Sequence, residues 1–326
     1  MFMAEEVKLD LKDKRLITEL DFNARATYNE LGKKIGLSKQ GVEYKLNVLM
    51  EKKVILGFYP VINVPKLGYN YFRFAFSFRN VTEKIEDEII EYLKAQKEIF
   101  WIFTFQGVYD VGFAVWSKSI LEFQKTINKL MSKYGKYVKN KNESIPTDVI
   151  HYQNRFLLKE PRTKEIHIQE TLVKSQIDDI DKKILKELCE NARKPLVEIA
   201  NTIDSSAKVV SYRVKKLEKE KIIEGYRPII NYSILGYTYY KLWVSINYES
   251  LKEINKLYDY IKCNTSVIYV VKGIGFPEDL DFEIVVKDNA ELYELIKDLK
   301  QKFPAVIGDY KILMSIDMKK VRYLPF

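Results

Sequence analysis

Two short segments concentrate side chains that can donate hydrogen bonds to phosphates and base edges. The segment SAKVVSYRVKKL (206–217) has four cations with no acid between them: Lys208, Arg213, Lys215 and Lys216. The segment SKQGVEYKLNVL (38–49) offers Lys39, Gln40 and Lys45, together with the acid Glu43. Arg presents a planar fork that matches guanine or phosphate, whereas Lys is a point charge. A basic helix face is also typical of an ordinary solvated surface, so the elements that carry these residues decide between the two interpretations.

The remaining composition offers little for catalysis or metal binding. The formal net charge is +9 with a pI near 9.1, which favours an anionic partner but also serves solubility. Two cysteines, Cys189 and Cys263, form neither a disulfide framework nor a zinc motif. The two histidines are His151 and His167, and the sequence has no nucleophile elbow or phosphate loop. We therefore expect no catalytic residue, no metal and no cofactor.

The basic segments belong to an internal repeat. An offset of 168 residues places Asp13 on Asp181, Asn23-Ala24-Arg25 on Asn191-Ala192-Arg193 and Ser38 on Ser206. The correspondence runs without a gap from residue 13 to 71 and also covers Val42, Tyr44, Gly57, Pro60 and Leu67-Gly68-Tyr69. A repeat of this length is too long for a solenoid unit, so each half should be a complete fold.

The first fifty or so residues of each half predict three short helices. In the first half Leu9, Leu16 and Leu20 recur at helical spacing, and Asn23-Ala24-Arg25 then interrupts the pattern. A second helix ends at Gly36, and Ser38 can cap a third. The short break between helices two and three is typical of a helix-turn-helix, which places the basic segment on its third helix. The segment KVILGFYPVIN lies where a wing would follow.

The rest of each half predicts a β-α-β-β-α-β module. In the first half YFRFAFSF, IFWIFTFQG, VYDVGFAVWS and DVIHYQNRFLL alternate as strands, and KIEDEIIEYLKAQ and ILEFQKTINKLMSKY are amphipathic. The second half repeats this order, with a three-residue insertion at FPED. The order is that of the ferredoxin-like split unit, with two helices on one face of an antiparallel sheet.

We therefore expect an α+β chain in five parts. A winged helix-turn-helix head spans 1–57 and a ferredoxin-like module spans 58–158; a second head spans 177–225 and a second module 226–326. The segment 159–176 has no counterpart in the first half and is polar, so we expect a linker. Its length permits the modules to pair within one chain or between two chains.

The paired motifs DLKDKRLITEL…NAR…ELGKKIGLS…GFYPVIN…LGY and DIDKKILKEL…NAR…EIANTIDSS…GYRPIIN…LGY resemble the Lrp/AsnC family of transcription regulators. The resemblance covers nearly the whole chain, twice. It implies a regulator that binds double-stranded DNA and whose ferredoxin-like module pairs with another copy and often senses an amino acid. Family members usually carry one copy per chain, so this chain could supply its own pseudo-dimer or form a homodimer.

The resemblance assigns roles to particular positions. The DNA-binding candidates lie on the two third helices: Ser38, Lys39, Gln40, Lys45, Ser206, Lys208, Ser211, Arg213, Lys215 and Lys216. The second head has more cations, so we expect it to bind more strongly, and Arg213→Ala should weaken binding more than Lys45→Ala. The effector candidates lie at the central β-β turns: Gly107, Asp110, Gly275 and Asp281. A turn glycine followed by a solvated carboxylate is the favoured interpretation of these four positions.

Two alternatives stay open. Some tetrapyrrole decarboxylases of the siroheme type resemble the same family and also occur as paired or fused copies; they would need His or Arg groups facing a pocket, and His151 is the candidate. A non-specific architectural DNA-binding protein would share all of these features, and only discrimination between sequences separates it from a regulator.

The expected location is the cytoplasm. The N-terminal MFMAEEVKLD lacks the basic and apolar regions of a signal peptide. No apolar run approaches the roughly 18 residues of a membrane span, so we expect no membrane partner.

Overall fold

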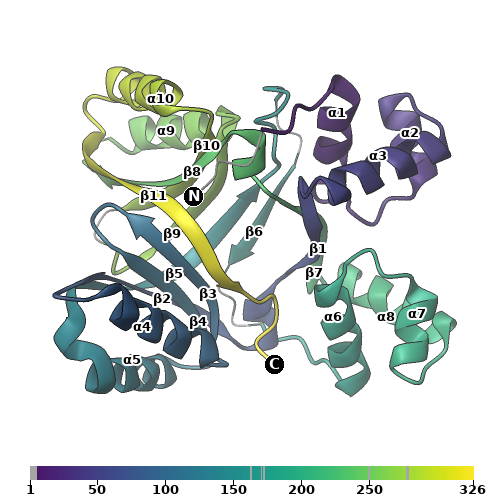
Figure 1. The fold of residues 1–326 in the computed structure, drawn as a ribbon, viewed down its shortest axis with the longest axis horizontal. Coiled ribbons are helices and arrows are strands. Elements are labelled where there is room, and N and C mark those ends of the chain that lie inside the picture. Colours follow the sequence, from purple (N-terminus) through teal and green to yellow (C-terminus); the bar gives the residue numbers. More distant parts are fainter. Residues whose placement is uncertain (1–5, 162–163, 170, 172, 249, 277–278) are drawn as a thin grey trace.

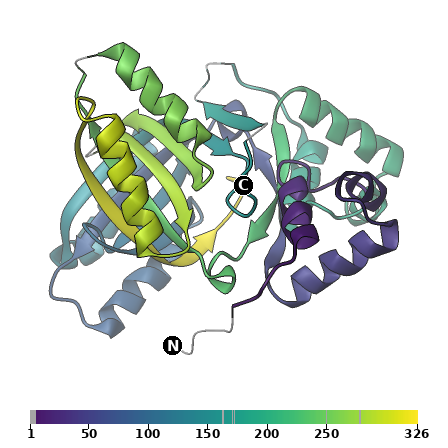
Figure 2. The ribbon, with the colours of Figure 1, turned by 90° about the horizontal axis from the view of Figure 1, so that it is seen from above.

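The chain folds into a pair of helical heads and a β-barrel that is covered by helices (Figure 1). The computed structural model describes residues 6–161, 164–169, 171, 173–248, 250–276 and 279–326. Figure 2 shows the same two bodies from above, with the strands β1 and β7 on the side of the heads that faces the barrel. Both heads and both modules therefore contribute to one compact arrangement within a single chain.

The first head has the three expected helices: α1 (Leu11–Leu20), α2 (Tyr28–Ile35) and α3 (Lys39–Glu51). Each begins at a polar cap, since Asp10, Thr27 and Ser38 accept a hydrogen bond from the third residue of their helix. Gly36 ends α2 at a φ of 67°, a left-handed conformation that glycine adopts without steric penalty. The left-handed Gly36 reverses the chain at once, so the turn between α2 and α3 is short.

The second head repeats the arrangement with α6 (Asp179–Glu190), α7 (Leu196–Thr202) and α8 (Ala207–Lys219). Asp178 and Ser206 cap α6 and α8. The buried side chains of both heads, including Leu16, Leu46, Ile184 and Leu217, belong to one continuous apolar cluster. The heads therefore share a core.

The β-rich segment that follows each head is a strand shared between the heads. β1 (Ile55–Ile62) and β7 (Ile223–Ile230) pair antiparallel with each other, with Tyr59 opposite Arg227. We expected this segment at the place of a wing, and it instead joins each head to its counterpart. Strands from distant parts of the chain leave no local sequence signal of their pairing.

Both modules have the predicted β-α-β-β-α-β order. The first consists of β2 (Asn70–Phe78), α4 (Glu83–Ala95), β3 (Ile99–Gln106), β4 (Val111–Ser117), α5 (Ile120–Tyr134) and β5 (Val138–Tyr152). The second consists of β8 (Thr238–Ile246), α9 (Leu251–Cys263), β9 (Val267–Ile274), β10 (Leu280–Val286), α10 (Asn289–Lys302) and β11 (Ile307–Val321). Short 3₁₀ helices at Val64–Leu67, Gly135–Tyr137 and Ser233–Leu235 complete the elements.

The two modules close into one barrel. The strand order is β2-β4-β3-β11-β8-β10-β9-β5-β6, and an additional β2–β5 pairing joins eight of these strands into a ring. The long last strand of each module therefore pairs with both modules: β5 with β2 and β9, and β11 with β8 and β3. Helices α4, α5, α9 and α10 pack on the outer face over two separate apolar cores.

The segment expected as a linker, 159–176, contains a strand. β6 (Glu165–Gln169) pairs antiparallel with β5 and places Ile166 opposite His151. Residues 162, 163, 170 and 172 of this segment lie outside the described residues. The expected boundaries 57/58 and 225/226 fall inside β1 and β7. Each of these strands pairs with the other head and then leads the chain into the barrel. Among the described residues, no helix is both long enough and apolar enough to cross a bilayer.

Candidate functional site

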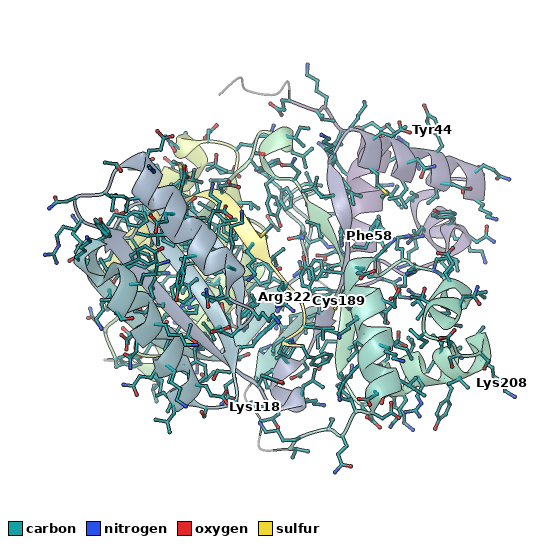
Figure 3. The ribbon with its side chains drawn as sticks, turned by 60° about the horizontal axis from the view of Figure 1, so that its bottom comes forward. Tyr44, Phe58, Lys118, Cys189, Lys208 and Arg322 are labelled. Atoms are coloured by element: carbon teal, nitrogen blue, oxygen red, sulfur yellow. The ribbon has the colours of Figure 1, made fainter. Side chains whose placement is uncertain are left out.

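The third helices α3 and α8 present most of the predicted DNA-binding residues to solvent. Ser38 and Ser206 are N-caps whose hydroxyl oxygens accept hydrogen bonds from the N–H groups of Gly41 and Val209, at 3.1 and 3.2 Å. Four of the other predicted side chains are exposed: Lys39, Gln40 and Lys208 within two residues of the caps, and Lys215 further along α8. Figure 3 shows Lys208 at the outer surface of its head.

Two of the predicted residues are held inside their own head. Lys45 Nζ lies 2.7 Å from Asp10 Oδ2 and 2.8 Å from Asp13 Oδ1, the acids at the start of α1. At the equivalent place Arg213 Nη1 lies 2.6 Å from Asp178 Oδ2 at the start of α6. The Asp181 N–H, with further help from Arg213, lowers the pKa of Asp178. These cations thus fix the third helix to the first in both heads.

The other two predicted residues of α8 are half-buried. Ser211 follows the buried Val210 and is itself of intermediate exposure, and Lys216 Nζ lies 3.9 Å from Glu220 Oε1. The exposed donors among the predicted residues of α8 are therefore Lys208, in the first turn of the helix, and Lys215, in its third turn.

Sequence reasoning missed two exposed tyrosines on the same helices. Tyr44 is 70% exposed and Tyr212 67% exposed, and they occupy equivalent positions in the two halves. Figure 3 shows Tyr44 projecting outward from the head. Large aromatic side chains at matching solvent positions cannot serve the core. Their recurrence at the repeat offset was the available signal.

The Asn-Ala-Arg motifs join the heads to each other. Arg25 Nη1 donates to the backbone oxygens of Ala192 and Lys194, and Arg193 Nη1 donates to those of Ala24 and Ala26. Each guanidinium also lies over an aromatic ring of the partner head or strand, Tyr226 for Arg25 and Phe58 for Arg193. The repeated motif is therefore a reciprocal clamp that sets the relative position of α3 and α8.

A buried ion pair connects the heads to the barrel. Arg227 on β7 pairs in bidentate fashion with Asp21 at the end of α1, with Nε–Oδ1 at 2.6 Å and Nη2–Oδ2 at 3.0 Å. The same guanidinium donates to the Tyr152 oxygen and to the Tyr269 hydroxyl of the barrel. It also lies 3.4 Å from His151 Nδ1, which can only accept from it. Burial, and then the charge of Arg227, hold the pKa of His151 well below its usual value, so this imidazole is neutral near pH 7.

The four effector candidates at the central turns are spread over the barrel. A Cβ on Gly107 would lie 2.6 Å from the Ile312 oxygen of β11, and one on Gly275 would lie 2.6 Å from the Glu143 oxygen of β5. Asp110 accepts a hydrogen bond from the Phe78 N–H at 2.7 Å. Each turn thus abuts the last strand of the other module. Residues 277 and 278 of the insertion lie outside the described residues.

Asp281 lies in a buried cluster of charges inside the barrel. Its Oδ2 is 2.6 Å from Arg73 Nη1 and 3.4 Å from Lys241 Nζ, and Lys241 also pairs with Glu283. Burial acts to raise the pKa of Asp281, but the charges of Lys241 and Arg73, which are equivalent residues of the two halves, hold it below its usual value. Asp281 is 1% exposed, so an effector could reach it only by entering the barrel.

A cavity of about 670 Å³ lies between the head pair and the barrel. Its walls come from β1 and β7 of the heads and from β3, β5, β9 and β11 of the barrel, with His151 among the lining residues. The lining is mostly apolar and aromatic, with Tyr59 and Tyr323 stacked at 4.4 Å and Phe100 and Trp116 at 3.8 Å. Figure 3 shows Arg322, which also lines the cavity, at the boundary between the two bodies. A volume of this size accommodates a drug-sized ligand.

Comparison with known proteins agrees with the duplicated architecture. A family model described as winged helix-turn-helix DNA-binding matches residues 9–55 and 177–224. The leucine-responsive regulatory protein of Rhizobium meliloti is 44% identical over 66 residues, which cover 20% of this chain and 42% of that protein. An uncharacterised HTH-type transcriptional regulator of Pyrococcus horikoshii is 30% identical over 127 residues, covering 38% of this chain and 78% of that protein. The chain belongs to the Lrp/AsnC family of transcription regulators.

This Lrp/AsnC chain also has a structural relative over nearly its whole length. The siroheme decarboxylase NirDL shares the fold with a TM-score of 0.62 and 13% sequence identity, over 97% of this chain and 94% of that one. The chain matches only about two fifths of the length of some curated relatives, such as the 42% of the Rhizobium meliloti protein. At this level of identity the likeness to the decarboxylase concerns the two-headed fold alone.

Proposed function

We propose that this protein is a sequence-specific DNA-binding transcription regulator that reads DNA with two unequal heads carried by one chain. The observation that carries the proposal is the pair of solvent-exposed third helices, α3 and α8, on heads fixed to each other by the β1–β7 ladder and the clamp of Arg25 and Arg193. A helix-turn-helix inserts such a helix into the major groove, and paired heads bind half-sites about one or two helical turns apart.

The predicted DNA-binding residues divide into two roles under this proposal. Exposed donors, namely Lys39, Gln40, Lys208 and Lys215, face solvent and can reach phosphates or base edges. The capping residues Ser38 and Ser206 place a helix N-terminus where a phosphate can approach it. Lys45 and Arg213 orient the third helices through their acidic partners.

The decisive experiment is a selection from random duplex DNA with the purified chain at about 150 mM salt. We expect enrichment of two half-sites of different sequence, about 10 or 21 base pairs apart, because the two recognition helices differ. A true regulator should prefer its site over random duplex by roughly 10³-fold or more. Equal retention of all sequences would instead identify a non-specific architectural protein.

The fold shared with a siroheme decarboxylase makes an enzyme the second candidate, and the neutral His151 on the wall of the 670 Å³ cavity is the observation that favours it. A tetrapyrrole with many carboxylates needs several cations to hold it. Among the described lining residues Arg322 is the one guanidinium or ammonium group, while Glu283 and Asp317 are acidic. The lining therefore does not fit a polycarboxylate tetrapyrrole, and we keep the regulator as the conclusion. A purified chain that carried a bound tetrapyrrole would reverse this choice.

A further inference from the structure

The cavity between the head pair and the barrel is lined by both halves of the duplication. Pro60 and Pro228 are equivalent residues, as are Tyr71 and Tyr239, and all four line it. One cavity therefore belongs to the chain as a whole rather than to each half. In a homodimer such a site would have identical residues on both sides.

The lining is nevertheless unequal on the two sides. Phe100 of the first half corresponds to Ile268 of the second, and Trp101 corresponds to Tyr269. On one side Phe100 stacks on Trp116 with their ring planes 6° apart. These differences provide flat aromatic surface on one side and smaller or more polar side chains on the other. A ligand would thus be held in a single orientation.

The two carboxylates among the described lining residues are each paired with a lysine, and the guanidinium of Arg322 donates to a backbone oxygen. Glu283 pairs with Lys241 and accepts a hydrogen bond from the Tyr239 hydroxyl. Arg322 donates to the Lys97 oxygen at 2.7 Å, and Asp317 pairs with Lys319 at 2.8 Å. His151 is neutral and its Nδ1 faces Arg227, so its proton resides on Nε2, where it can be donated. The lining thus favours a ligand without net charge that offers a hydrogen-bond acceptor.

We propose that this cavity binds an uncharged planar ring compound with a hydrogen-bond acceptor at its edge, and that the regulator senses this compound there. The sensing part rests on the function proposed above, whereas the binding part does not. The site is separate from the central β-β turns, where Gly107 and Gly275 abut the last strands of the barrel.

Occupancy at this place would act directly on the heads. Tyr59 and Pro228 belong to the ladder that joins the heads, whereas Val149 and Tyr323 belong to the barrel side of the cavity. A ligand that contacts both sides stabilises the arrangement of heads and barrel to which it binds most tightly. By linkage, the affinity for DNA and the affinity for the ligand then change by the same factor.

The binding part can be tested with Nile red, which is planar, uncharged and carries a ring carbonyl. Its fluorescence should report saturable binding of one molecule per chain in the absence of DNA. Val149→Trp and Ile316→Trp both place an indole on the cavity lining, and each should weaken binding at least tenfold. Ile316 is 56% exposed, so this second variant does not depend on repacking a core.

The matched control is Val197→Trp, which adds the same indole at a 59% exposed position of α7, and its binding should remain within about twofold of the parent chain. His151→Phe keeps the shape of the lining and removes the donor, so binding should weaken roughly three- to tenfold. Binding that does not saturate, or that is unchanged in both cavity variants, would overturn the proposal.

Two further titrations separate the proposals from each other. Uroporphyrin III, a planar polycarboxylate, should not compete with Nile red, and displacement that Val149→Trp abolishes would overturn the charge argument. Addition of a selected duplex should change the Nile red dissociation constant at least threefold; an unchanged value would overturn the sensing part. The absence of any duplex that binds specifically would instead count against the DNA-binding function and leave the Nile red result intact.

Discussion

Equivalent residues of the two halves have diverged where the heads meet the barrel. Asp21 corresponds to Cys189, and Tyr59 corresponds to Arg227. On one side Asp21 and Arg227 form a buried ion pair; on the other Tyr59 bonds to the Tyr269 hydroxyl and stacks on Tyr323. Tyr59 and Arg227 face each other across the β1–β7 ladder, so a symmetric dimer would have brought two like residues together at this place. The fused chain instead has a charged side and an uncharged side.

The buried ion pair should contribute strongly to stability. Asp21→Ala would leave the guanidinium of Arg227, which is 1% exposed, without its carboxylate. We expect the free energy of unfolding to fall by about 3–5 kcal/mol, measured by urea denaturation. The control is Cys189→Ala at the equivalent position, which removes no charge and should cost less than about 1.5 kcal/mol. Similar losses for both variants would show that the ion pair is not fully desolvated.

His151 should make stability depend on pH. Its folded pKa lies well below the usual value of about 6.5, mainly because of burial and then because of Arg227. The unfolded chain therefore binds more protons below about pH 6.5, and stability is fully present above that pH and decreases as the pH falls. The slope from this residue is at most about 1.4 kcal/mol per pH unit. His151→Phe should flatten the decrease between pH 6.5 and 5; an identical pH profile would contradict the assignment.

At the scale of elements, α8 carries two exposed lysines where α3 carries exposed uncharged residues. Lys208 and Lys215 on α8 correspond to Gln40 and Asn47 on α3. Replacing the two lysines by their counterparts, as Lys208→Gln with Lys215→Asn, makes the second head resemble the first. We expect weaker DNA binding at 150 mM salt. The slope of log K against log salt should decrease by about 0.9 for each phosphate that the variant no longer neutralises.

The reverse exchange provides the control for this prediction. Gln40→Lys with Asn47→Lys adds the same charges to the first head, and it should strengthen binding and steepen the salt dependence. If neither double variant changes the slope, the exposed lysines of α8 do not contact phosphates.

The packing of β7 against β6 gives a second prediction for the elements. A Cβ on Gly225 would lie 3.2 Å from both Ile166 Cδ1 on β6 and the Phe22 oxygen, whereas one on its counterpart Gly57 would lie 3.6 Å from Ile229. We expect Gly225→Ala to lower the melting temperature and to cost about 1–3 kcal/mol. Gly57→Ala should be nearly neutral. Equal effects would indicate that β6 does not pack tightly on the ladder.

The elements themselves were largely predictable, whereas their long-range pairings were not. Repeat spacing, caps such as Ser38 and strand alternation indicated the three-helix heads and the order of both modules, because these signals are local. The pairing of β1 with β7 joins segments far apart in the sequence, which no local pattern encodes. The short strand β6 pairs with its sequence neighbour β5, but its polar surroundings resemble a linker. The cavity and the Asp21–Arg227 pair depend on those pairings. Lys45 and Arg213 were expected to be free donors because their acidic partners, too, are distant in the sequence and leave no local signal.

At the scale of the whole molecule, ring closure makes the two halves depend on each other. β5 and β11 each complete one module and bind the edge of the other. A protease site inserted between Glu160 and Pro161 should therefore yield two fragments that remain together on size exclusion, with a melting temperature that now increases with protein concentration. The uncut chain, with the same insertion, should melt at a temperature independent of concentration. Fragments that separate on cleavage would contradict the closed barrel.

Closure within one chain also changes how occupancy would follow gene dosage. A regulator that must find a second copy loses active species with the square of its abundance when its dimer is weak, because both partners become scarce together. Here both heads are synthesised in a fixed one-to-one ratio and meet at a concentration set by the chain rather than by the cell. Halving the number of molecules would then halve the number of complete readers, so a cell could operate this protein at a few copies.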